Sequence, residues 1–167
     1  MFKAITLMLF ISIATFTHSA FANSSIYKQS GINAPKDSSK CKNKCLLKKE
    51  KFNIDKASED EIGYSQAVKV GNTIYVSGAV GWGKMEDAIK LAYQELDKSL
   101  KNYNATFANV VKENLYTTSL DSVIKHKEIR KNYYGKDFPA ATWVEVKRLY
   151  NPDLVVEVEI IAVLPEK

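Results

Sequence analysis

The sequence predicts an α+β fold with the element order β-β-α-β-α-β-β, in which one sheet carries two helices on one face. Three observations predict it. A Gly-Asn turn at 71–72 separates two β-rich runs, apolar residues recur at helical spacing over 85–103, and valine alternates with glutamate within 154–163. A chain of this length with this alternation of elements indicates one layered domain.

The first two strands are expected to form a β-hairpin. Residues 65–70 alternate weakly between polar and apolar side chains, and residues 73–77 are β-rich. The Gly-Asn pair at 71–72 tolerates the positive φ values of a two-residue turn. The glycine-rich stretch 78–83 lacks the spacing of a phosphate-binding loop. We expect a loop there, whose glycines serve flexibility or close backbone packing.

The helix over 85–103 is the clearest single element. Its apolar residues recur every three or four positions with charged residues between them, which is typical of a helix that faces a core. The predicted core residues of this helix are Ala88, Ile89, Ala92, Leu96 and Leu100.

A strand within 107–118 and a second helix over 120–134 follow. Ser119 or Asp121 is suited to cap the start of this helix, and Gly135 lies where a C-terminal glycine belongs. The predicted inner face of the second helix consists of Val123, Ile129 and Tyr133.

Two β-rich runs, 138–149 and 154–163, flank an Asn-Pro-Asp turn at 151–153 and predict a C-terminal hairpin. In the second run Glu157 and Glu159 alternate with apolar residues, so one face is apolar and the other carries carboxylates. These glutamates either form a solvated face, or one of them lines a pocket.

Residues 1–22 have the pattern of a secretory signal peptide, with a basic start, an apolar run over 5–16 and an Ala-x-Ala site at 20–22. The apolar run is shorter than the roughly 20 residues that span a bilayer. We therefore expect an exported protein, periplasmic or secreted, with no membrane attachment after cleavage. Loss of His18 leaves His126 as the only histidine of the mature chain, so neither a His-rich metal site nor a Ser-His-Asp triad is expected. We expect no cofactor.

A lysine-rich extension is expected over 23–60, ahead of a folded domain over 61–167. The lysine cluster within 40–51 has no interleaved aromatic residue and no arginine, so a solvated extension is favoured and no nucleic acid is expected as a partner. Cys41 and Cys45 lie in this extension, where export favours oxidation. They pair either with each other across a small loop or between chains.

Two motifs carry a resemblance to a known family. The segment Phe138–Leu149 reads Phe-Pro-Ala-x-x-x-Val-Glu-Val-x-Arg-Leu, and a Val-Glu-Val-Glu-x-Ile-Ala-Val run ends at Val163. Together with Gly63–Gly78 they resemble the Rid family of reactive intermediate deaminases, also called YjgF-type proteins. The resemblance covers residues 64–163 and identifies the chain as a divergent member, and the signal-peptide pattern makes it an expected exported one. It implies a chorismate-mutase-like fold, a homotrimer, and a small-molecule ligand in a cleft between subunits.

The resemblance also implies a chemistry. Family deaminases hydrolyse 2-imino acids or enamines to 2-keto acids and ammonia, and an arginine after Phe-Pro-Ala binds the substrate carboxylate. Ala141 stands at that position, Trp143 stands where the family has a small residue or cysteine, and Lys127 aligns with an asparagine. The family's remaining site residues are retained as Tyr64, Ser77 and Glu157, with Glu157 as the catalytic carboxylate and the others as substrate-binding residues.

The absent arginine leads us to expect weak or absent imino-acid deaminase activity, because a bidentate charged contact is missing. The cleft would then bind another small molecule or accept an altered substrate, and Trp143 would stack on that ligand or pack between subunits. Two alternatives remain open. One is an active imine or enamine hydrolase that uses Glu157 and a relocated cation, for which Lys127, Lys147 and Arg148 are candidates. The other is a secreted interaction protein that acts through its basic extension.

Overall fold

The structure is a computed structural model that describes residues 47–166. Its elements are β1 (Lys49–Phe52), α1 (Lys56–Ile62), β2 (Ala67–Val70), β3 (Thr73–Trp82), α2 (Met85–Asn102), the 3₁₀ turn η1 (Phe107–Asn109), β4 (Val110–Thr117), α3 (Leu120–Lys125), α4 (Lys127–Tyr134), β5 (Ala140–Glu145) and β6 (Leu154–Val163). The expected signal peptide, the cysteine pair Cys41 and Cys45, and the extension up to residue 46 lie outside these residues. Within 47–166 no helix is long and apolar enough to cross a membrane.

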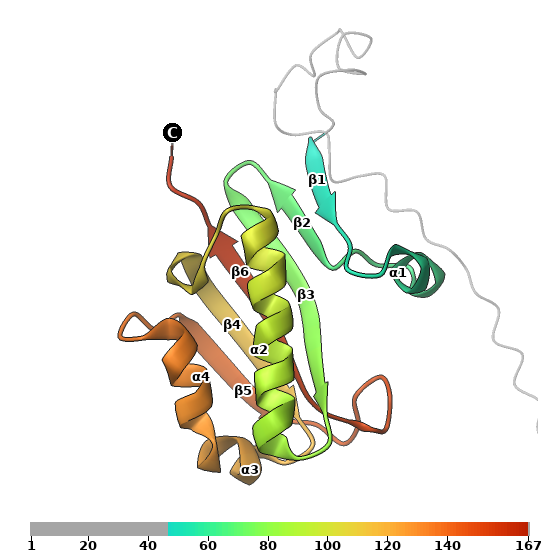
Figure 1. Cartoon of the computed structure of the whole chain (residues 1–167), viewed down its shortest axis with the longest axis vertical. Helices are drawn as coiled ribbons and strands as arrows, with labels where there is room; N and C mark the ends of the chain where they lie inside the picture. The colour runs from blue at the N-terminus through green and yellow to red at the C-terminus, as the bar shows by residue number, and fades with distance from the viewer. Residues whose placement is uncertain (1–46, 167) are drawn as a thin grey trace, which may run out of the picture. The chain divides into compact units, whose positions relative to one another are not determined.

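The strands form one six-stranded sheet in the order β1-β2-β3-β6-β4-β5, and α2 and α4 cover one of its faces (Figure 1). All neighbouring strands are antiparallel except β4 and β5, which are parallel. The predicted α+β class, with a single sheet and helices on one face, is confirmed.

The predicted C-terminal hairpin is wrong, because β4 lies between β5 and β6. The turn itself forms as expected, with the backbone N–H of Asp153 donating to Asn151 Oδ1 at 3.0 Å. Such a turn reverses the chain only locally and does not select the strand that pairs. The more apolar strand β6 takes the centre of the sheet, where both of its edges are paired, and β5 takes the edge.

The alternation predicted for β6 is confirmed. Val156, Val158 and Ile160 are at most 2% exposed and face α2, while Glu157 and Glu159 lie on the other face and are half-buried. The predicted inner face of α2 is also confirmed, since all five of its apolar positions are at most 1% exposed.

The glycine-rich stretch 78–83 is mostly strand rather than loop. β3 continues to Trp82, with register shifts between Val76 and Ala79 and again after Gly81. Close packing explains the missing side chain at Gly81, because an added Cβ would overlap the backbone carbonyl of Ala88 in α2. The expectation of close backbone packing therefore holds at this glycine.

The sheet begins earlier in the chain than the sequence indicates. β1 pairs with β2 in the register Lys49↔Val70 to Phe52↔Ala67, and α1 follows with Asp55 as its N-cap. Both elements lie largely in the stretch that the sequence analysis assigned to the extension. A strand of four residues with three charged side chains is too short and too polar to show alternation.

The second predicted helix is divided into α3 and α4 at His126, whose φ of −103° and ψ of 16° are not helical. Val123 of α3 is buried as predicted, and Ile129 and Tyr133 of α4 pack against the core. Gly135 ends α4 with a positive φ of 64°, at the position expected for it.

We predict that Gly81→Ala lowers the free energy of unfolding by about 3 kcal/mol, because the new methyl group must push α2 away from β3. Urea denaturation followed by circular dichroism measures the loss.

Gly83→Ala is the matched control for this prediction. Gly83 has a φ of +81° and nothing within 4 Å of an added Cβ, so only the left-handed backbone penalty of about 1 kcal/mol applies. Equal losses for the two variants would show that the contact between Gly81 and Ala88 is not tight.

Candidate functional site

Three of the residues that the sequence analysis selected, Tyr64, Ser77 and Glu157, line one cavity of about 370 Å³. The cavity lies where the end of α1, the middle of β3, the start of β6 and a side chain of α2 meet. Its other lining residues are Ile62, Gly78, Val80, Glu95, Tyr150 and Leu154. The resemblance assigned these three residues to one site, and the fold of a single chain brings them together.

Glu157 reaches the cavity because of the register between β3 and β6. Val80 pairs with Glu157, and the register shift between Val76 and Ala79 places Gly78 next to the glutamate side chain. An added Cβ at Gly78 would overlap Glu157 Oε1, so the missing side chain makes room for the carboxylate.

Tyr64 and Ser77 are held by the open end of the β2–β3 hairpin. Ser77 Oγ donates to the carbonyl oxygen of Ser65 at 2.8 Å, and the Ser77 N–H donates to the carbonyl oxygen of Gln66 at 2.9 Å. The Tyr64 N–H donates to the carbonyl oxygen of Glu59 at 3.0 Å, directly after α1 ends. The segment before β2 is thereby fixed on β3.

Glu59 supports this arrangement and was not selected from the sequence. Its side chain is 2% exposed and accepts hydrogen bonds from the N–H groups of Ile54 at 2.6 Å and Gln66 at 2.7 Å, and from Asn53 Nδ2 at 2.5 Å. The carboxylate thus joins the segment before α1 to the segment after it. An acidic residue in a charged helix gives no sign of burial in the sequence.

The cavity favours protonated or uncharged ligand groups. Burial raises the pKa of Glu157, and the nearby charge of Glu159 raises it further. Burial also raises the pKa of Glu95 and that of Tyr64. None of the described residues that line this cavity is a lysine, arginine or histidine. The cavity can therefore accept hydrogen bonds from a ligand or orient a water, but it has no cation for a carboxylate.

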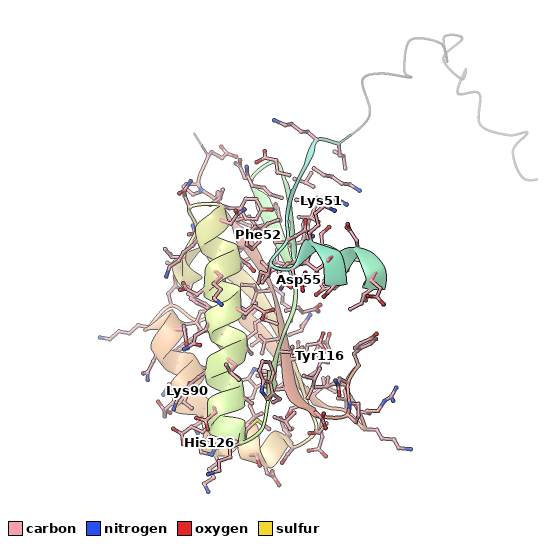
Figure 2. All side chains as sticks on the ribbon, turned by 45° about the vertical axis from the view of Figure 1, so that its right-hand side comes forward. Lys51, Phe52, Asp55, Lys90, Tyr116 and His126 are labelled. Carbon is pink, nitrogen blue, oxygen red and sulfur yellow. The ribbon has the colours of Figure 1, made fainter. Side chains whose placement is uncertain are left out.

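Glu159 is fixed beside Glu157 by two hydrogen bonds. Its Oε1 accepts from Asn114 Nδ2 at 2.8 Å and from the Tyr116 hydroxyl at 3.2 Å. Figure 2 shows Tyr116 on the side of the sheet away from α2. These bonds keep the Glu159 charge in place, where it adds to the larger effect of burial in raising the pKa of Glu157.

A second hollow of about 650 Å³ adjoins the first and shares Tyr64 and Ser77 with it. Its lining includes Lys49 and Lys51 of β1, and Lys51 is labelled in Figure 2. Lys56 also lines this hollow, and its ammonium pairs with Asp60 at 2.5 Å. The hollow beside β1 is therefore mainly positive and the Glu157 cavity is negative, and both are lined by Tyr64 and Ser77.

The other selected residues lie elsewhere on the chain. Ala141 and Trp143 are on the edge strand β5, and Lys127 is exposed on α4. Lys147 and Arg148 are exposed beyond the end of β5. None of these five residues lines the Glu157 cavity of its own chain.

Trp143 belongs to a buried polar network around Glu113 of β4, which was not selected from the sequence. Glu113 is 0% exposed, and its Oε1 accepts from Arg130 Nε at 2.7 Å and from Trp143 Nε1 at 3.1 Å. Its Oε2 accepts from the hydroxyls of Tyr134 at 2.7 Å and Tyr93 at 2.8 Å. The sequence does contain one signal for this network, which is a glutamate on the apolar face of a strand. A buried carboxylate of this kind needs a cationic partner.

The chain is similar in sequence to known proteins. The family model described as Endoribonuclease L-PSP matches residues 55–164. A RutC family protein of Pyrococcus abyssi is 32% identical over 125 residues, which cover 70% of this chain and 98% of that protein. The human 2-iminobutanoate/2-iminopropanoate deaminase is 31% identical over 109 residues, which cover 60% of this chain and 79% of that protein.

A solved structure agrees in fold. The crystal structure of a YjgF/YER057c/UK114 family member from Mycobacterium tuberculosis matches with a TM-score of 0.66 and 29% identity, over 70% of this chain and 100% of that chain. The sequence motifs, the sheet topology and the family match therefore agree, and the chain belongs to the Endoribonuclease L-PSP family, the family of YjgF and Rid proteins.

Proposed function

We propose that this protein binds a small imine or enamine in the Glu157 cavity and hydrolyses it to a carbonyl compound and ammonia. The observation that carries the proposal is the Glu157 carboxylate, which has a raised pKa and lies over Gly78 beside Tyr64 and Ser77. Several similar proteins are named as 2-iminobutanoate/2-iminopropanoate deaminases, which supports this reaction class.

The reaction needs one water and one base. The water oxygen forms a bond to the imine carbon while Glu157 accepts a proton from the water. The C=N π electrons move to the nitrogen, which takes that proton from Glu157 to give a neutral carbinolamine. Glu157 then carries the proton of the new hydroxyl group to the nitrogen. The C–N bond breaks as an oxygen electron pair forms C=O, and the nitrogen leaves as ammonia. The raised pKa of Glu157 brings its proton affinity closer to that needed near neutral pH.

Ligand binding without hydrolysis, or hydrolysis of an altered substrate, is the second candidate. The specific observation in its favour is that no described residue lining the cavity is cationic, while Ala141 stands at the position where the resemblance places a carboxylate-binding arginine. The same absence argues against a phosphate ligand such as RNA in this cavity, because Glu95 and Glu157 would repel it.

We also propose that the protein is exported and acts as a homotrimer. The pattern of residues 1–22 supports export. The sheet face opposite α2 supports self-association, because it carries Tyr75, which is 50% exposed, and several half-buried apolar side chains with no helix over them among residues 47–166. A second copy of the chain is the proposed cover. Action through the basic extension 23–60 remains an alternative that no observation here favours.

We predict that the purified protein releases ammonia from 2-iminobutanoate generated in the cuvette, and that Glu157→Gln lowers this rate by about 10²–10⁴-fold. Glu157 must be ionised to act as a base, so the rate should fall as the pH drops through its raised pKa. The acidic limb of the pH–rate profile should therefore lie above the range of an ordinary glutamate. A rate equal to the uncatalysed reaction would instead favour the binding candidate.

Glu159→Gln is the matched variant for this profile. It keeps an oxygen that can accept from Asn114 and Tyr116 but removes the charge that raises the pKa of Glu157. The acidic limb should move to lower pH while the plateau rate stays within a few-fold of the unmodified protein. A limb that does not move would mean that another group titrates.

Gly78→Ala tests the position of the carboxylate. The new methyl group displaces the Glu157 side chain, and a shift of about 1 Å in a catalytic group costs on the order of 10²-fold in rate. Because the displaced atoms belong to a flexible side chain, the midpoint of urea unfolding should stay close to that of the unmodified protein. Full activity in this variant would contradict the proposed role of Glu157.

A further inference from the structure

We infer that Arg130 is the carboxylate-binding residue of this protein, in place of an arginine at position 141. This inference deepens the proposed function and rests on it for the reaction. The binding of a carboxylate by Arg130 can be tested separately from hydrolysis.

The Arg130 guanidinium has two terminal nitrogens that no residue within 47–166 uses as hydrogen-bond donors. Arg130 is 7% exposed, and its Nε donates to Glu113 Oε1 at 2.7 Å. Neither terminal nitrogen, Nη1 or Nη2, has a hydrogen-bond partner among residues 47–166. Within that part of the chain no fully buried side-chain nitrogen or oxygen lacks a partner, so both terminal nitrogens reach the surface. A guanidinium edge with two free N–H groups matches the two oxygens of a carboxylate.

The surrounding residues hold this guanidinium in one position. Its central carbon lies 4.7 Å from the ring centre of Tyr134, 5.3 Å from that of Trp143 and 6.0 Å from that of Phe138. Glu113 fixes the Nε side and is itself fixed by two tyrosine hydroxyls and the Trp143 indole. A carboxylate that binds here meets a positioned donor pair in a partly dehydrated environment, and the rings offer apolar contact to the rest of the ligand.

Ala141 leaves this surface open. It pairs with Glu113 in the register of β4 and β5 and lies on the same face as Trp143, whose indole reaches Glu113. The alanine side chain is short and exposed, so nothing long projects from this position over the Glu113–Arg130 pair. The resemblance places an arginine at position 141 of β5. In this chain Arg130 of α4 supplies the positive charge instead.

The other cations considered for this role are less suited to it. Lys127, Lys147 and Arg148 are exposed, and no described contact fixes their charged groups. Lys49 and Lys51 line the hollow beside the Glu157 cavity, but each carries a single ammonium on a flexible, exposed side chain. A lysine ammonium cannot form the paired contact that a fixed guanidinium makes.

The Glu157 cavity and Arg130 meet only if two copies of the chain associate. Arg130 is absent from the residues that line the cavity of its own chain, which lies at β3 and β6, whereas Arg130 lies at β4 and the edge strand β5. A neighbouring copy that places its β5 edge at the cavity mouth brings Arg130 to the acid group of the bound imino acid. The partner copy therefore contributes a residue that the site lacks without it.

Equilibrium binding to the full-length protein tests this inference without any catalytic step. The probes are 2-oxobutanoate and 2-butanone, which differ by the carboxylate, and isothermal titration calorimetry measures both. We expect the unmodified protein to bind 2-oxobutanoate on the order of 100-fold more tightly than 2-butanone. Arg130→Lys keeps a charge near Glu113 but loses the paired donors, so it should lose most of this preference. No preference in the unmodified protein would overturn the inference.

A second set of variants guards against unfolding, because removal of Arg130 alone leaves the Glu113 charge buried and unpaired. The double variant Arg130→Met with Glu113→Gln removes both charges. The control is Lys131→Ala, which removes a charge from the same helix where the ammonium pairs with Glu128. The double variant should lose the preference for 2-oxobutanoate, and Lys131→Ala should keep it. Loss of the preference in Lys51→Ala instead would assign the carboxylate to the hollow beside β1 and overturn the inference.

Hydrolysis separates the two proposals. Arg130-dependent binding without ammonia release would contradict the proposed reaction but not the carboxylate site. In a protein that does hydrolyse 2-iminobutanoate, Glu157→Gln and Arg130→Lys subunits that are refolded together should regain about a quarter of the original rate, because one site in four then combines both intact residues. No recovery on mixing would contradict a site shared between copies.

Discussion

The register of β6 in the middle of the sheet is the constraint on which the rest of the structure depends. β6 pairs with β3 on one side and β4 on the other, and its apolar side chains fill the layer beneath α2. A shift of one residue would place Glu157 and Glu159 under that helix and expose Val156, Val158 and Ile160. The same pairing brings Glu157 to Gly78, so the core and the cavity are set by one alignment.

The chain separates its charges in a way that suits the proposed chemistry. The cavity at β3 and β6 contains Glu157 and Glu95, whereas the network at β4 and β5 contains Arg130. Within one chain, Arg130 is not among the groups that shift the pKa of Glu157 or that of Glu95. Separation keeps Glu157 available as a base and keeps the guanidinium edge available for an acid group. In the proposed assembly, a second copy would bring Arg130 to the acid group of a substrate bound beside Glu157.

The sequence predicted those elements whose signal lies within a few neighbouring residues. The inner face of α2, the alternation of β6 and the Gly71-Asn72 turn all follow from spacing within a short stretch. The separation of β5 from β6 depends on β4, which is distant in sequence, so turn chemistry could not reveal it. β1 is too short to show a period.

The site was predictable only in part, for related reasons. Tyr64, Ser77 and Glu157 were selected through their motifs, and they gather at one cavity. Arg130 lies in a helix among charged residues, where its sequence context resembles a solvated surface. Its burial follows from the partner Glu113 and from the aromatic rings around it, which come from separate elements of the fold.

β1 has a further consequence for assembly. Strand edges with free backbone groups tend to recruit further strands, and lysines at such an edge oppose this because like charges would meet. β1 is the outermost strand at this end among residues 47–166, and Lys49 and Lys51 on it would oppose the addition of a further strand from another copy.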